Sequence, residues 1–128
     1  MKSHSTDADV IDILVVDDFP DAAESLAMLL KMDGYSVRLA FSAEEALNAI
    51  DTATPLCVLL DIAMPGMDGL DLARQLRARF GDDVILVAVT GSSGSEPRVD
   101  ETFSLVDHYF VKPVLASDIR QIFPPKDS

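Results

Sequence analysis

Five short apolar runs, separated by stretches with helical periodicity, constrain the fold of this chain most strongly. Val10–Val16 and Leu56–Leu60 are apolar over nearly their whole length, as strands buried on both faces of a sheet are. Between the runs, apolar residues recur at helical spacing. Strands that alternate with helices predict an α/β fold, a doubly wound five-stranded parallel sheet with helices on both faces.

Local signals mark where the helices begin and end. Pro20 suits a first helical position, and Asp33-Gly34 stops the helix that follows. Ser42 with Glu45 three residues later forms a capping box. We expect the other strands at Tyr35–Ala40, Val84–Val89 and His108–Val111, and helices at about 20–32, 42–50, 70–80 and 114–123.

The length of 128 residues corresponds to one domain, expected at 10–123 between a flexible N-terminal tail (1–9) and a C-terminal tail (124–128). Cys57 is the single cysteine, so no intrachain disulfide can form, which favours a reducing cytoplasm. No apolar run approaches the roughly 20 residues that span a bilayer, so membrane insertion is not expected. The net charge of −12 repels nucleic acid. Composition alone leaves open whether this acidity serves solubility or gathers acids around a cation.

Polar residues follow four of the five strands. Asp17 and Asp18 follow the first, Asp61 the third, Thr90 the fourth and Lys112 the fifth. In such folds the ligand site lies beyond the carboxyl ends of the strands, so these side chains are expected to converge. Three converging carboxylates repel one another unless a cation neutralises them. Mg²⁺, with Mn²⁺ as an alternative ion, prefers such oxygen ligands.

This set of residues suits phosphoryl transfer. The carboxylate of Asp61 can act as a nucleophile and form an aspartyl phosphate. Lys112 supplies a point charge, and the Thr90 hydroxyl a hydrogen bond, for the phosphoryl oxygens. Taken singly, an Asp at a strand end is more often a turn or helix cap. The prediction therefore depends on all the residues meeting at one edge of the sheet.

Four motifs resemble the receiver domain of two-component response regulators, a fold shared with the chemotaxis response regulator. They are ILVVDD (13–18), LLDIAMPGMDG (59–69), VAVTG (87–91) and YFVKP (109–113). The resemblance covers residues 10–123 and implies a flavodoxin-like fold. It implies a signalling switch rather than a metabolic enzyme, with limited self-catalysed phosphorylation and dephosphorylation. Such a domain takes a phosphoryl group from a histidine kinase or a histidine phosphotransfer protein, and either stands alone or is excised from a longer regulator.

The resemblance also assigns roles around the metal. It implies that Asp61 is the phosphoacceptor and a metal ligand, and that Asp18 ligates Mg²⁺ directly. Asp17 does so through water, and the backbone carbonyl of Ala63 is a further ligand.

Other roles implied by the resemblance concern the phosphoryl group and the conformational switch. Lys112 and Thr90 contact the phosphoryl group, and the bond before Pro113 is cis. Tyr109 matches the switch aromatic, which turns inward as Thr90 moves.

The resemblance implies a docking face for the phosphodonor on the first helix and the loop after the fifth strand. There the chain offers Phe19, Pro20, Ala23 and Pro113. Phe19 and Pro20 serve equally well as an ordinary helix entry, and the output partner cannot be read from the sequence.

Departures from the family pattern gather between the fourth and fifth strands. The segment 91–97 is rich in Ser and Gly, the helical patch at 99–106 is weak, and 103–108 (FSLVDH) lacks the family's glycine. Ala63 and Ser92 occupy positions that modulate phosphate lifetime in the family, and both are small.

The sequence argues against three other functions. A receiver-like module that is never phosphorylated usually lacks one of the key residues, and all are present here. A phosphatase with an Asp nucleophile usually has a second Asp two positions later, where this chain has Ala63. A dinucleotide-binding domain needs a Gly-rich turn after the first strand, where this chain has 17–20 (DDFP).

Overall fold

A computed structural model describes residues 11–61, 69–90, 105–111 and 114–123. The strands form one sheet in the order β2-β1-β3-β4-β5, with every neighbouring pair parallel. This confirms the predicted fold. The predicted tails and most of the helical patch at 99–106 lie outside the described residues. The elements are β1 (Ile11–Val16), α2 (Pro20–Met32), β2 (Val37–Ala40), α3 (Ala43–Thr52), β3 (Pro55–Asp61), α4 (Gly69–Phe80), β4 (Ile85–Thr90), β5 (His108–Val111) and α6 (Ala116–Ile122).

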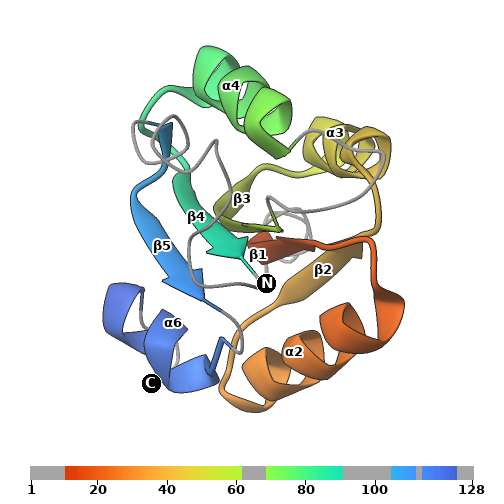
Figure 1. Cartoon of the computed structure of the whole chain (residues 1–128), viewed down its shortest axis with the longest axis vertical. Coiled ribbons are helices and arrows are strands. Elements are labelled where there is room, and N and C mark those ends of the chain that lie inside the picture. The colour runs from red at the N-terminus through yellow and green to blue at the C-terminus, as the bar shows by residue number, and fades with distance from the viewer. Residues whose placement is uncertain (1–10, 62–68, 91–104, 112–113, 124–128) are drawn as a thin grey trace, which may run out of the picture.

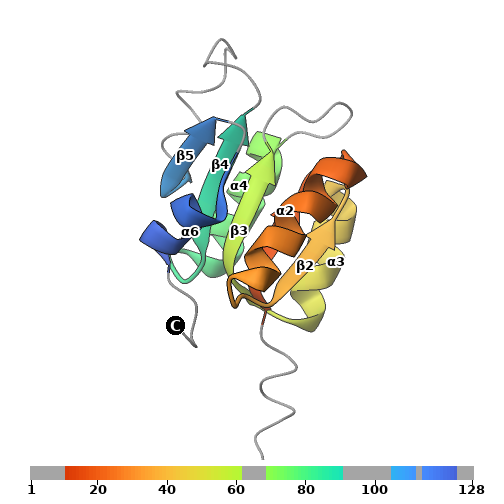
Figure 2. The same cartoon turned by 90° about the horizontal axis from the view of Figure 1, so that it is seen from below.

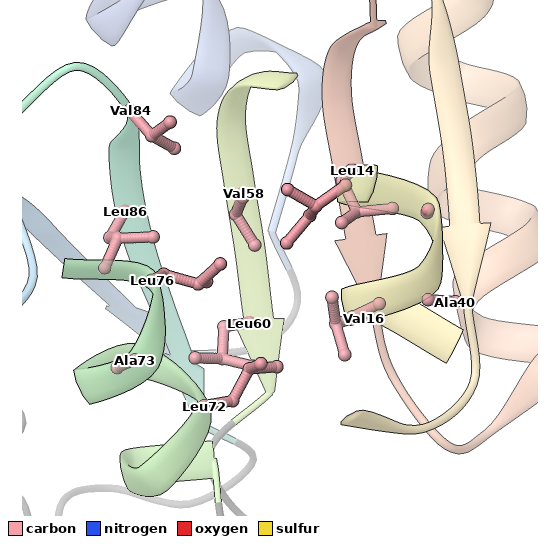
Figure 3. Close-up of a cluster of buried hydrophobic side chains, with 13 residues drawn as sticks. Leu14, Val16, Ala40, Val58, Leu60, Leu72, Ala73, Leu76, Val84 and Leu86 are labelled. Carbon is pink, nitrogen blue, oxygen red and sulfur yellow. The ribbon is translucent and has the colours of Figure 1, made fainter. Parts of the chain in front are cut away.

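Helices cover both faces of the sheet. Figure 1 shows α3 and α4 on one face and α2 and α6 on the other, and the view in Figure 2 agrees. Successive strand residues point to opposite faces, so Leu14 and Val16 pack with α3 and α4 in one cluster (Figure 3), and Ile13 and Val15 pack with α2 and α6 in the other. Every residue of β1 is buried, which explains its nearly continuous apolar run.

The predicted helix limits are close to the observed ones. The Ser42 hydroxyl accepts the Glu45 N–H at 3.1 Å, and the Glu45 carboxylate accepts the Phe41 N–H at 2.9 Å. Gly34 and Gly81 follow α2 and α4 with φ of 106° and 58°, a left-handed conformation that glycine adopts without strain.

β2 begins at Val37, two residues later than predicted, because side-chain bonds hold the preceding residue. The Ser36 N–H donates to the Asp12 carboxylate and the Asp12 N–H donates to the Ser36 hydroxyl, both at 2.9 Å. The Tyr35 N–H still belongs to the end of α2, since it donates to the Leu30 carbonyl at 3.1 Å.

The last helix is fastened to the turn between α2 and β2. Arg120 donates from two nitrogens to the Asp33 carboxylate, at 2.7 and 3.0 Å. This pair lowers the pKa of Asp33 and raises that of Arg120. The Tyr35 ring stacks on Phe123 with centroids 5.6 Å apart, and its hydroxyl donates to the Phe123 carbonyl. α6 therefore has a fixed position beside α2.

Candidate functional site

The direction of the chain through the sheet reverses between β1 and β3. From β1 it continues to β2 on one side, and from β3 to β4 and β5 on the other. In open parallel sheets this is the place where ligands bind, beyond the carboxyl ends of the strands. Val16 pairs with Leu60, so Asp17 and Asp61 stand one step further along the two neighbouring strands, at the predicted place.

Three acids meet at this point. Carboxylate oxygens of Asp17, Asp18 and Asp61 all lie within 4.8 Å of one another. Asp17 and Asp61 are 6% and 7% exposed, whereas Asp18 is exposed. At 4.8 Å two unit negative charges repel by about 3–4 kcal/mol at an effective dielectric constant of about 20. A cation bound between the three carboxylates would relieve this repulsion, and the all-oxygen donor set fits Mg²⁺.

Backbone contacts orient the first of these acids. The Phe19 N–H donates to Oδ1 of Asp17 at 3.0 Å, and the Asp17 N–H donates to the Ala40 carbonyl of β2 at 3.0 Å. A carboxylate held in this way stays in place without a bound ion, so the site is pre-organised on the β1 side.

Of the remaining predicted site residues, Thr90 and Tyr109 lie in described strands. Thr90 is the last residue of β4, and because Asp61 pairs with Val89 it stands one step beyond that pair. Tyr109, half-buried in β5, pairs with Ala88. Outside the described residues lie Lys112, Pro113, Ala63 and Ser92, so their predicted contacts and the cis bond stay predictions.

A pocket of about 300 Å³ adjoins the acids, between α2 and the start of α6. Asp17 and Asp61 lie at its acidic end, and the rest of the wall is mostly apolar. This size is at the lower limit of small-molecule pockets. Beside the two acids, its wall consists of Val15, Val16, Ala22, Ser25, Leu26, Leu29, Leu59, Val89, Val114 and Leu115.

The predicted docking face on α2 needs one correction. Phe19 and Pro20 are exposed, as a docking residue must be, but Ala23 is only 1% exposed and packs into the core. The prediction for Ala23 was wrong, because that side chain points toward the sheet. The pocket wall on α2 is the neighbouring stripe Ala22, Ser25, Leu26 and Leu29, whose helical spacing is visible in the sequence.

Comparison with known proteins identifies one family. The family model described as "Response regulator receiver domain" matches residues 13–123. Among curated proteins, the response regulator MprA of Mycolicibacterium vanbaalenii is 40% identical over 107 residues, and that of Mycobacterium avium is 39% identical over 107 residues. Each alignment covers 84% of this chain and 46% of the relative, so the chain spans about half the length of the curated relatives it matches.

Solved structures give the same result. A CheY-like receiver domain from Methylobacillus flagellatus has a TM-score of 0.77 at 32% identity, covering 88% of this chain and 95% of that one. The response regulator TrrA from Thermotoga maritima, solved in complex with Mg(2+)-BeF, has a TM-score of 0.75 at 33% identity, with the same coverage. Within the described residues, no helix has the length and apolar character needed to span a membrane.

Proposed function

We propose the following residue roles from the premise that this chain belongs to the response regulator receiver domain family, the phosphoacceptors of two-component signalling. Asp61 is the phosphoacceptor. The observation that carries this assignment is that Asp61 ends β3, is 7% exposed, and lies within 4.8 Å of the carboxylate oxygens of Asp17 and Asp18.

In the transfer step a carboxylate oxygen of Asp61 forms a bond to phosphorus. The bond from phosphorus to the donor's histidine nitrogen breaks at the same time, and that nitrogen keeps the bonding electron pair. Lys112 and the Thr90 hydroxyl bind the phosphoryl oxygens and hold the group in line with Asp61. This domain is thus a switch that changes state, not an enzyme that turns over a metabolite.

Asp18, Asp61 and the backbone carbonyl of Ala63 would hold the metal ion directly, and Asp17 would hold it through water. When bound, Mg²⁺ or Mn²⁺ neutralises these carboxylates and the charge on the phosphoryl oxygens. Asp17 keeps its orientation through the Phe19 N–H.

The phosphodonor is a histidine kinase or a histidine phosphotransfer protein, which docks over the pocket beside Asp61. The supporting observations are the largely apolar pocket wall, formed by α2 and by the residues just before α6, and the exposed Phe19 and Leu115, at 58% and 53%. These features suit the apolar face of a helix that carries the phosphohistidine close to Asp61. The output partner stays unnamed. Cys57, a buried free thiol, suits a reducing cytoplasm.

The signal leaves the site through the fourth and fifth strands. Phosphorylation draws Thr90 toward the phosphoryl group, and Tyr109 on the neighbouring strand turns inward in response. The pairing of β4 with β5 places Tyr109 beside Ala88, two residues before Thr90.

Phosphorylation with a small phosphodonor and Mg²⁺, followed by intact-protein mass spectrometry, tests the acceptor. We expect the wild-type chain to gain about 80 Da, and Asp61→Asn to gain nothing. Asp82→Asn, which changes an exposed acid between α4 and β4, is the control and should be labelled like the wild type. Stoichiometric labelling of Asp61→Asn would move the acceptor elsewhere, and an unlabelled wild-type chain would point to a module that is never phosphorylated.

A further inference from the structure

Arg77 of α4 is unusually well bound for a charged helix residue. Its side chain is only 18% exposed. The Nε atom donates to the Leu105 carbonyl at 2.6 Å, and one terminal nitrogen donates to the carbonyls of Gly81 and Val84 at 2.8 and 3.0 Å. The other terminal nitrogen binds the Asp107 carboxylate at 2.7 Å. One side chain thus joins the end of α4, the approach to β4 and the approach to β5.

Asp107 makes two hydrogen bonds with β4 just before β5 begins. Its N–H donates to the Leu86 carbonyl at 2.8 Å, and its carboxylate accepts the Leu86 N–H at 2.9 Å. The regular pairing starts one residue later, at Val87 and His108. Partial burial acts to raise the pKa of Asp107, but the bonds from Arg77 and Leu86 outweigh it and lower that pKa. The carboxylate is therefore a charged, stable partner for Arg77.

β5 needs such an anchor because its own pairing specifies little. It has four residues, pairs with β4 at the edge of the sheet, and none of its residues is fully buried. Only Tyr109 and Phe110 are half-buried, so a strand this short makes few contacts that fix its register, and a slip of one residue turns every side chain to the opposite face. For β5 such a slip would turn Tyr109 to the opposite face of the sheet, and would take Val111 out of its pairing with Thr90.

We infer that Arg77 and Asp107 form a positioning clamp that sets the register of β5, and thereby keeps Tyr109 beside Ala88 and Val111 beside Thr90. The inference rests on the proposed function for its effect on phosphorylation. Neither residue of the clamp touches the reacting atoms. The clamp lies at the amino end of β5, and the register that it sets extends to the carboxyl end of the strand.

The test compares Arg77→Gln and Asp107→Asn with a matched control. Arg79→Gln removes another arginine of α4, whose partner is Asp51 of α3 and whose side chain is 44% exposed. Each variant carries 3-fluorotyrosine, and the chain's two tyrosines give two ¹⁹F resonances. Tyr35, which packs in the cluster beneath α2 and α6, is the internal reference for Tyr109. All measurements are made at a temperature at which circular dichroism shows every variant folded.

We expect the Tyr109 resonance to shift or split in both clamp variants, while that of Tyr35 stays. Labelling of Asp61 at saturating Mg²⁺ should slow by about tenfold, since a displacement of about 1 Å in a reacting group can cost about 100-fold. Because the two residues act as one unit, the double variant should be no slower than the slower single variant. Arg79→Gln should leave both readouts unchanged.

A purely structural role would lower the free energy of unfolding and leave the folded protein's Tyr109 resonance and labelling rate at their wild-type values. That result would overturn the clamp. If Arg77→Gln does not fold, Asp107→Asn decides, because it keeps the side chain's shape and one carbonyl oxygen. If the wild-type chain takes no label, the proposed function fails, and the clamp is then judged by the Tyr109 resonance alone: a shift supports it and no shift refutes it.

Discussion

Two polar side chains within the sheet show how single residues are accommodated in an apolar layer. Asp12 interrupts the apolar run of β1 and is only 7% exposed. Its carboxyl group accepts the Ser36 N–H at 2.9 Å, so this buried polar group has the hydrogen bond that it needs. Cys57 lies in the middle of β3, fully buried, and burial raises the pKa of its thiol to about 12.

The raised pKa of Cys57 predicts an unreactive thiol. At pH 8 the thiolate fraction should be roughly a thousand times smaller than that of a free cysteine, because only the ionised form reacts. Reaction with an aromatic disulfide reagent, followed by absorbance, should therefore be very slow in the native protein and fast in denaturant. Rapid reaction of the folded chain would show that β3 opens locally far more easily than the buried sheet suggests.

At the scale of elements, the start of α3 tests most clearly whether a local sequence signal, the N-cap, determines where a helix begins. Ser42→Ala should lower the free energy of unfolding by about 1 kcal/mol, because the Glu45 N–H loses its acceptor. Ser42→Gly should lower it by only a few tenths of a kcal/mol. Urea denaturation measures both.

Ser42→Thr keeps the cap oxygen and is the control, expected to lie close to the wild type. If Ser42→Ala is as stable as the wild type, packing of α3 against the sheet, and not the cap, determines where this helix begins.

The strands and the acid cluster could be predicted because the sequence encodes them directly. A strand buried on both faces is a run of apolar residues, and the parallel rule then brings Asp17, Asp18 and Asp61 to one edge. The start of β2 could not be predicted, because Ser36 is held by Asp12, a contact between residues far apart in the chain.

The Arg77 contacts could not be predicted for a related reason. Three of its acceptors are backbone carbonyls. Every residue has a backbone carbonyl, so no residue type in the sequence indicates which ones accept from Arg77. The orientation of Ala23 was predicted incorrectly because several alanines and leucines of α2 fit an apolar stripe, and only packing decides which of them face the sheet.

At the scale of the whole molecule, the acid cluster links folding to divalent ions. A ligand that binds only the folded state at 100 times its dissociation constant adds about 2.7 kcal/mol of stability. We therefore expect Mg²⁺ to raise the midpoint of thermal unfolding in a saturable way, measured by circular dichroism in Mg²⁺-free and Mg²⁺-containing buffers.

Asp18→Asn should have opposite effects on stability, relative to the wild type, in the two buffers. Without Mg²⁺ the variant should be at least as stable as the wild type, because one of three clustered charges is gone. With Mg²⁺ it should gain less, because a ligand is missing. An equal gain in wild type and variant would mean that the ion binds elsewhere.

Three of the side-chain fastenings described above share one location. The bonds between Asp12 and Ser36, between Arg120 and Asp33, and from Arg77 all lie where strands begin, whereas the acids lie where strands end. One end of the sheet therefore carries these three contacts, and the opposite end carries the acid cluster. Substitutions around the acids can therefore alter the chemistry of the domain without removing any of these three fastenings.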